Sequence, residues 1–116
     1  MNIEELRELC LSFPHATEDV KWGHDLCFLV GGKMFAATGL EEGSGKVSFK
    51  CTPEKFAELT ERAGIIPAPY VARYHWIAVE DPNALSEEEY EDLISRSYLL
   101  VYENLPLKQR KSLGKK

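Results

Sequence analysis

Two adjacent glycines, Gly31 and Gly32, constrain the fold of this chain more than any other feature of its sequence. They separate an apolar run from Asp25 to Val30 from a second run, from Lys33 to Leu40. A two-residue turn between antiparallel strands needs positive φ angles, which glycine adopts at little cost. The pattern therefore predicts a β-hairpin.

A third strand is expected next to this hairpin. The loop from Glu41 to Gly45 leads into residues Lys46 to Cys51, in which apolar and polar side chains alternate. Val47 and Phe49 would face one side of the sheet, and Ser48 would face the other together with the flanking lysines. The three strands would form an antiparallel meander with one face open to water.

The stretch from Tyr70 to Val79 is rich in aromatic and β-branched residues, which favour a pleated, half-buried surface. We therefore expect it to be a central strand. Side chains on a strand alternate between the two faces of the sheet, which would place Tyr74 and Trp76 on one face and Arg73 and His75 on the other. The neighbouring segments from His15 to His24 and from Ile65 to Pro69 are predicted to be irregular connections.

Three helices are expected. The first begins after Asn2 and stops at Pro14, and the second begins at Thr52-Pro53. The last follows Ser86, which with Glu89 forms a capping box. We predict an α+β fold with one domain over residues 1–107 and a basic tail over residues 108–116.

The charge is unevenly distributed over the 116 residues. Residues 1–102 hold nine Lys or Arg and eighteen Asp or Glu, whereas residues 103–116 hold five basic residues and one Glu. An acidic body disfavours wrapping by a phosphate backbone, although a basic tail can still contact an anionic partner. No apolar run approaches the ~20 residues that cross a bilayer, and the N-terminus does not resemble a signal peptide. We expect a cytoplasmic protein that does not bind membranes.

The sequence spells out neither a metal site nor a catalytic site. The three histidines lie in separate elements, and no two cysteines are close together in sequence. Cys51 and His75 would meet only if their strands pair, and a buried thiol and a core histidine are the favoured explanation, because nothing in the sequence indicates an activated thiolate. We expect no enzymatic activity and no cofactor. The loop from Trp22 to His24 is retained as a less favoured site for a small molecule or metal.

Seven short stretches, in this order, resemble the MmcQ/YjbR family of small bacterial proteins over nearly the whole chain. These are Lys21-Trp22-Gly23-His24, Gly32-Lys33-Met34-Phe35-Ala36, Phe49-Lys50-Cys51, Pro67-Ala68-Pro69-Tyr70, His75-Trp76-Ile77, Ser97-Tyr98 and Leu105-Pro106. The resemblance implies a CyaY-like (frataxin-like) two-layer α/β sandwich. It also implies DNA binding, in which hairpin loops serve as wings. A frataxin-like role in iron binding would need acidic residues gathered on the first helix and strand, whereas Glu18 and Asp19 are expected in a loop.

Two functions follow as hypotheses. In the first, a non-enzymatic module binds DNA through its sheet face, hairpin loops and basic tail. Its candidate contacts are basic or aromatic side chains, namely Lys33, Lys46, Lys50, Arg73, Tyr74, His75, Lys108, Arg110 and Lys111. In the second, the chain binds a protein partner or a second copy of itself and no nucleic acid.

Overall fold

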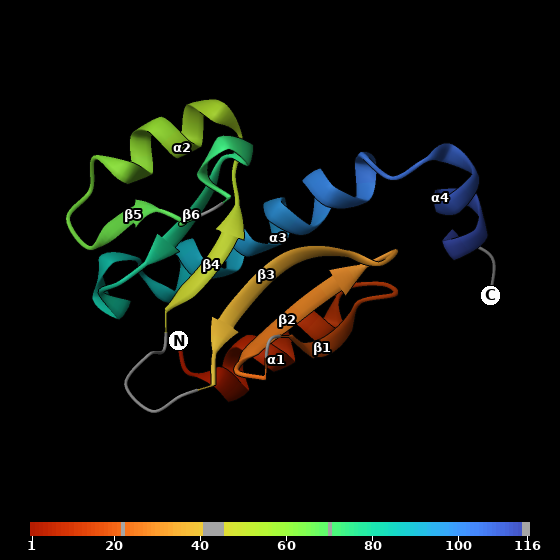
Figure 1. Cartoon of the computed structure of the whole chain (residues 1–116), viewed down its shortest axis with the longest axis horizontal. Helices are drawn as coiled ribbons and strands as arrows, with labels where there is room; N and C mark the ends of the chain where they lie inside the picture. Colours follow the sequence, from red (N-terminus) through yellow and green to blue (C-terminus); the bar gives the residue numbers. More distant parts are fainter. Residues whose placement is uncertain (22, 41–45, 70, 115–116) are drawn as a thin grey trace.

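The computed structural model describes residues 1–21, 23–40, 46–69 and 71–114, which form one antiparallel sheet and a layer of helices (Figure 1). The strands are β1 (Thr17–Lys21), β2 (Asp25–Val30), β3 (Lys33–Gly39), β4 (Val47–Lys50), β5 (Ile65–Pro67) and β6 (Trp76–Val79). The α-helices are α1 (Ile3–Ser12), α2 (Pro53–Thr60), α3 (Glu87–Glu103) and α4 (Leu107–Gly114), and two short 3₁₀ turns are η1 (Ala72–Tyr74) and η2 (Pro82–Ala84).

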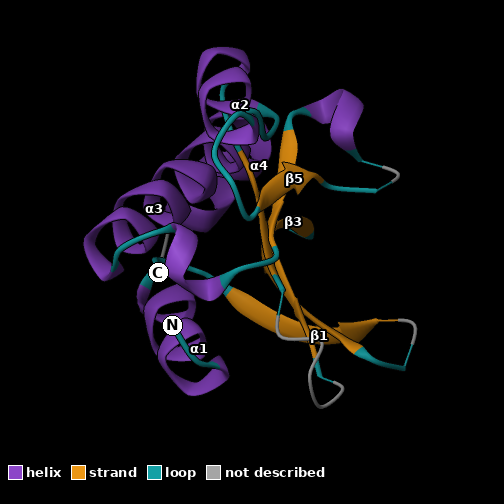
Figure 2. Cartoon of the chain, turned by 90° about the vertical axis from the view of Figure 1, so that its left-hand side faces the viewer, coloured by secondary structure: helices purple, strands orange, loops and turns teal. Residues whose placement is uncertain are grey.

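The six strands lie in the order β1-β2-β3-β4-β6-β5, and every neighbouring pair is antiparallel. All four helices lie on one side of this sheet (Figure 2). The main core fills the space between the layers, where the side chains of Phe28 and Phe49 meet those of Leu6 and Ile94. Apolar area removed from water in this layer is the main stabilising contribution.

A β-bulge in β3 places two consecutive residues in the core. Phe28 pairs with Ala36 and Leu29 pairs with Met34, so Phe35 is the extra residue. Phe35 is fully buried, and its ring centroid lies 5.9 Å from that of Phe13 and 5.4 Å from that of Tyr98. The bulge thus anchors β3 to α1 and α3.

The predicted hairpin and the α+β fold class are confirmed. Strand β2 has the expected limits, and Gly31 and Gly32 have φ angles of 58° and 78°. The capping boxes at Asn2 and Ser86 are both formed. The predicted loop from Glu41 to Gly45 lies outside the described residues.

Four local predictions were wrong. Residues 17–21 form edge strand β1 rather than a loop, and residues 65–67 form a short strand rather than an irregular connection. The expected central strand is shortened to β6. The residues just before it form turn η1 instead, which ends at His75, whose φ angle of 66° is incompatible with a strand. Strand β6 lies between β4 and β5 rather than at the centre. In addition to these four differences, helix α4 contains residues 108–114 of the expected basic tail.

None of the helices that the structure describes is both long and apolar enough to cross a membrane.

Candidate binding surface

The side of the sheet opposite the helices, which we call the open face, is the candidate site. Strand register defines it, because residues paired directly across neighbouring strands point to the same face. One row of such residues crosses all six strands and consists of Asp19, Cys27, Ala37, Ser48, Ala78 and Ile66. The central members of this row have small side chains, so the surface of the open face is recessed along its middle.

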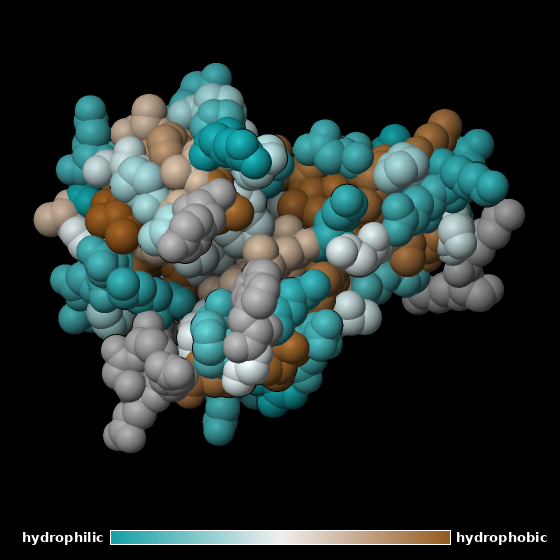
Figure 3. All heavy atoms as spheres, in the orientation of Figure 1, coloured by the Kyte–Doolittle hydropathy of each residue, from teal (hydrophilic) through white to brown (hydrophobic). Residues whose placement is uncertain are grey.

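Two segments project on this side of the sheet (Figure 2). One carries η1 and precedes β6, and the other is the hairpin formed by the end of β1 and the start of β2. Figure 3 views the molecule from this side and shows hydrophilic side chains interspersed with apolar ones. The open face is therefore bounded at two places rather than being a flat surface.

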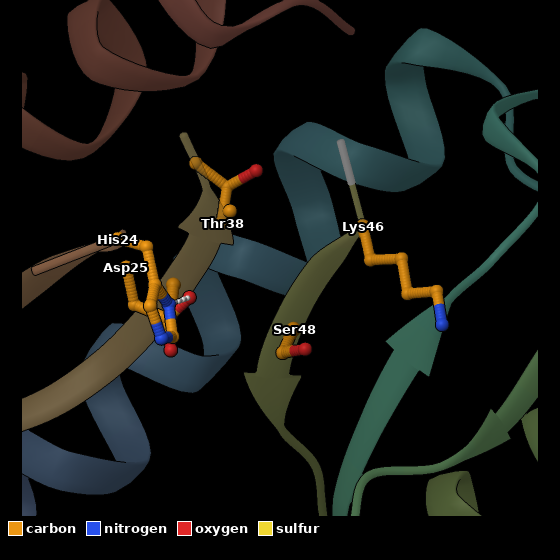
Figure 4. A pocket seen from close by; sticks show the side chains of 7 residues that line it. His24, Asp25, Thr38, Lys46 and Ser48 are labelled. Atoms are coloured by element: carbon orange, nitrogen blue, oxygen red, sulfur yellow. Dashed lines mark hydrogen bonds and ion pairs between the residues drawn. The ribbon is translucent and has the colours of Figure 1, made fainter. Parts of the chain in front are cut away.

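A hollow of about 260 Å³ lies on the open face over β2, β3 and β4. Ala37, Gly39 and Ser48 line it together with a pair formed by His24 and Asp25, whose Nδ1 and Oδ1 atoms are 3.3 Å apart (Figure 4). Lys46 lines it from the β4 side, and its Nζ lies 3.2 Å from a carboxylate oxygen of Glu80. The hollow is thus bordered by side chains of both signs of charge.

Part of the open face is apolar. This differs from the expectation of a sheet face that is open to water throughout. Trp76 is only 6% exposed and packs with Ala68 and Ala78 in a small cluster separate from the main core. Met34 and Val71 contact the same cluster. Trp76 therefore attaches the η1 segment to the sheet.

Three of the predicted contact residues, Lys50, Arg73 and Tyr74, lie in one region, where the end of β4, the start of β6 and η1 meet, whereas Lys46 lies at the opposite end of β4. Lys50 pairs with Trp76 and shares its face of the sheet. Arg73 and Tyr74 lie on η1, where the guanidinium carbon sits 4.9 Å from the centre of the tyrosine ring. The Tyr74 ring is half exposed.

His75 belongs to the same segment but is oriented differently. Its ring lies edge-on to Phe56 of α2, with the ring centroids 5.6 Å apart. Its carbonyl oxygen accepts a hydrogen bond from the Cys51 N–H at 2.8 Å. His75 therefore helps to join η1 to α2 rather than forming part of the open face.

The other predicted basic residues lie elsewhere. Lys33 pairs with Val30, a core residue, and so points to the helical side of the sheet. Helix α4 lies at the far end of the molecule from η1 (Figure 1), where Gln109 Nε2 donates a hydrogen bond to the Gly31 carbonyl at 2.6 Å. The structure thus separates Lys33 and the α4 residues Lys108, Arg110 and Lys111 from the open face.

Acidic residues on the open face were missed by the sequence reasoning. Asp19 and Asp25 belong to the β1 and β2 half, and Glu80 pairs with Lys46 at the other side. Glu18 and Asp19 lie in β1, not in a loop as expected. Residues 17–21 show no alternation of apolar and polar side chains, so the sequence carried no local signal for this strand.

The cysteines are not activated as nucleophiles. Burial raises the pKa of both the Cys10 and the Cys51 thiol to about 12, and burial also raises the pKa of Cys27. Cys51 meets His75 through the backbone hydrogen bond described above, while the His75 ring contacts Phe56. A thiolate, not a thiol, is the reactive species, so these residues have the character of core side chains.

Alkylation is expected to show this directly. In native protein at about pH 8, Cys10 and Cys51 should react with iodoacetamide orders of magnitude more slowly than in urea-unfolded protein, because burial suppresses the thiolate and blocks access. Mass spectrometry of peptides after timed labelling would measure the rates. Rapid labelling of Cys51 alone in native protein would contradict the assignment and point to a reactive thiol.

Residues 1–21, 23–40, 46–69 and 71–114 contain no group of three or more His, Cys, Asp or Glu side chains placed to hold a metal ion. Trp22, part of the alternative small-molecule site, lies outside these ranges.

Comparisons with known proteins agree with this fold. Over 111 residues the chain is 28% identical to the protein YbdF of Escherichia coli O157:H7, and the match covers 93% of this chain and 90% of YbdF. The crystal structure of Deinococcus radiodurans protein DR2400, with a DUF419 domain, superimposes with a TM-score of 0.88 at 29% identity over 97% of this chain and 88% of that one.

A crystal structure of a protein from Pseudomonas syringae matches with a TM-score of 0.70 at 23% identity, over 87% of this chain and 99% of that chain, and shows the shared fold. The YjbR family model matches residues 11–100, which include all six strands and most of α3. This chain therefore belongs to the YjbR family.

Proposed function

We propose that this protein is a non-enzymatic module that binds single-stranded DNA on the open face of its sheet. The observation that carries the proposal is the exposed pair of Arg73 and Tyr74 on a segment that projects beside the lysine-bearing strand β4. Cationic groups that follow a phosphate backbone, next to an aromatic ring on which a base can stack, are what single strands require. The resemblance described above points to the same class of ligand.

Tyr74 is the expected stacking residue. Its ring is half exposed, whereas Trp76 and the His75 ring are engaged in packing. Stacking of a base on an aromatic side chain contributes about 1–3 kcal/mol and depends little on the base. Arg73 on the same turn would contact the adjacent phosphate.

The distribution of charge on the open face limits where a DNA strand can bind. Lys50 and Arg73 are on the β4 and η1 side, whereas Asp19 and Asp25 make the β1 and β2 side unfavourable for phosphates. Lys46 contributes less because Glu80 partly neutralises it. We therefore place the DNA strand along β4 and η1, without a contribution from α4. With few phosphate contacts, binding should be weak and should weaken further with salt.

Fluorescence anisotropy of a labelled single-stranded oligonucleotide, at two salt concentrations, tests the proposal. The double variant Lys50→Glu/Arg73→Glu should lose at least tenfold in affinity, because two cations become anions on the binding side. The matched control is Lys33→Glu/Lys108→Glu, which makes the same change in net charge away from the open face. It should retain most of the affinity.

Equal losses in both double variants would show that only net charge matters and would contradict the placement on the open face. Absence of wild-type binding at low salt would contradict the function itself. The alternative of a protein-binding module would then be the leading hypothesis.

A further inference from the structure

Strand β1 leaves one edge of the sheet available for pairing. It is the first strand in the sheet order and pairs only with β2, and Thr17 to Val20 are exposed. Among the described residues, no backbone hydrogen bond reaches its outer edge from another element. The opposite edge, β5, has three residues and ends in Pro67, which is a common way of protecting an edge.

Apolar side chains gather beside this edge on the helical side. Val20 is 50% exposed and Leu40 is 42% exposed, and both line a hollow of about 550 Å³ with Ile3 and Leu26. Large aliphatic side chains next to unpaired backbone groups favour the addition of another strand.

We propose that two copies of this chain associate by antiparallel pairing of their β1 strands, with Val20 on the two-fold axis. In this register Asp19 lies opposite the partner's Lys21 on the open-face side, and the symmetry repeats the pair. Asp19 pairs with Cys27 and Lys21 with Asp25 in the present sheet, which places both side chains on the open-face side. Val20 would meet its own symmetry copy on the helical side, next to Leu40.

Charge selects this register over its neighbours. Side chains opposite each other in such a dimer must share a face, so the register can move only in steps of two residues. A shift by one such step places Asp19 opposite the partner's Asp19, and a shift by two steps places Glu18 opposite the partner's Glu18. Like charges in direct opposition are unfavourable. Only the proposed register brings opposite charges together within residues 17–21.

Glu18 does not disturb the proposed contact. Arg7 holds it through two hydrogen bonds, at 2.8 Å and 2.7 Å, and these lower the pKa of its carboxyl group. Both groups stay on the helical side of β1, away from the Asp19 and Lys21 side chains.

The two-fold axis would run perpendicular to the sheet, so the two sheets would become one continuous sheet with both open faces on the same side. This contact involves a different surface from the proposed DNA site, and it stands or falls independently of that proposal. An interface made of one strand and a few aliphatic side chains would bury less than about 1,200 Å² of surface, which is at the low end for protein–protein interfaces. We expect a dissociation constant in the range of tens to hundreds of micromolar.

Sedimentation equilibrium of the full chain, from about 10 μM to about 1 mM, measures this association. Lys21→Asp should raise the dissociation constant at least tenfold, because it places two Asp pairs across the strands. The charge swap Asp19→Lys/Lys21→Asp should restore association to within about threefold of wild type. Lys33→Asp, with the same change in net charge as Lys21→Asp on the helical side of the sheet, is the control and should associate like wild type.

Val20→Asp provides a second test that does not depend on the ion pairs, because it brings two carboxylates together at the axis. It should also dissociate the dimer, and circular dichroism would verify that each variant is folded. A wild-type chain that stays monomeric at about 1 mM would overturn the proposal. So would a dimer that survives both Lys21→Asp and Val20→Asp, or a folded charge-swap variant that fails to recover association.

Discussion

Replacing Phe35 by alanine is expected to lower the free energy of unfolding by about 3–5 kcal/mol. Phe35 is fully buried at the β-bulge and packs against Phe13 and Tyr98. Its removal would leave a cavity where β3, α1 and α3 meet. Since domains of this size are stable by only about 5–15 kcal/mol, the change should be large in urea denaturation followed by tryptophan fluorescence.

Two further variants keep this prediction testable even if Phe35→Ala does not fold. Phe35→Leu retains most of the volume and should cost about 1 kcal/mol. Tyr74→Ala removes an aromatic ring of similar size from a half-exposed position and should change stability little. A loss in Phe35→Ala no greater than in Tyr74→Ala would contradict the role assigned to the bulge.

Replacing Ser97 by alanine is expected to cost about 2–3 kcal/mol, although only one oxygen atom is removed. The Ser97 hydroxyl is completely buried, donates a hydrogen bond to the Phe35 carbonyl at 2.7 Å and accepts one from the Lys50 N–H at 3.0 Å. Alanine would leave both backbone groups without this partner, and an unsatisfied buried polar group costs about 1–3 kcal/mol.

Ser95→Ala is the matched control, because it makes the same chemical change one half-turn earlier on α3 at a partly exposed position. It should change the urea midpoint by the equivalent of less than about 0.5 kcal/mol. If Ser97→Ala and Ser95→Ala unfold at the same urea concentration, the link from α3 to β3 and β4 carries no net stability.

Local chemistry was sufficient to predict the elements with strong signals. Gly31 and Gly32 specify a hairpin through their positive φ angles. Asn2 and Ser86 specify helix starts, because each side chain accepts a hydrogen bond from a backbone N–H of the first turn. These features involve residues close in sequence, so they can be read without knowing the fold.

Elements with weak local signals required the tertiary structure. Strand β1 is exposed along nearly its whole length and lacks an apolar alternation, so only its pairing with β2 defines it. The first part of the Tyr70 to Val79 run was mistaken for a strand, because its aromatic residues favour a sheet whether they lie in one or stand next to it. Packing of the His75 ring on Phe56 instead stabilises a left-handed residue there.

The same division applies to the candidate site. The sequence by itself determined the family resemblance, the α+β class and a set of basic and aromatic residues. Only the tertiary structure decided which of them share a surface, since the face on which Lys33 or Lys50 lies depends on strand register and on the bulge at Phe35. Register arises from contacts between distant parts of the chain, and a shift of one residue moves every side chain to the opposite face.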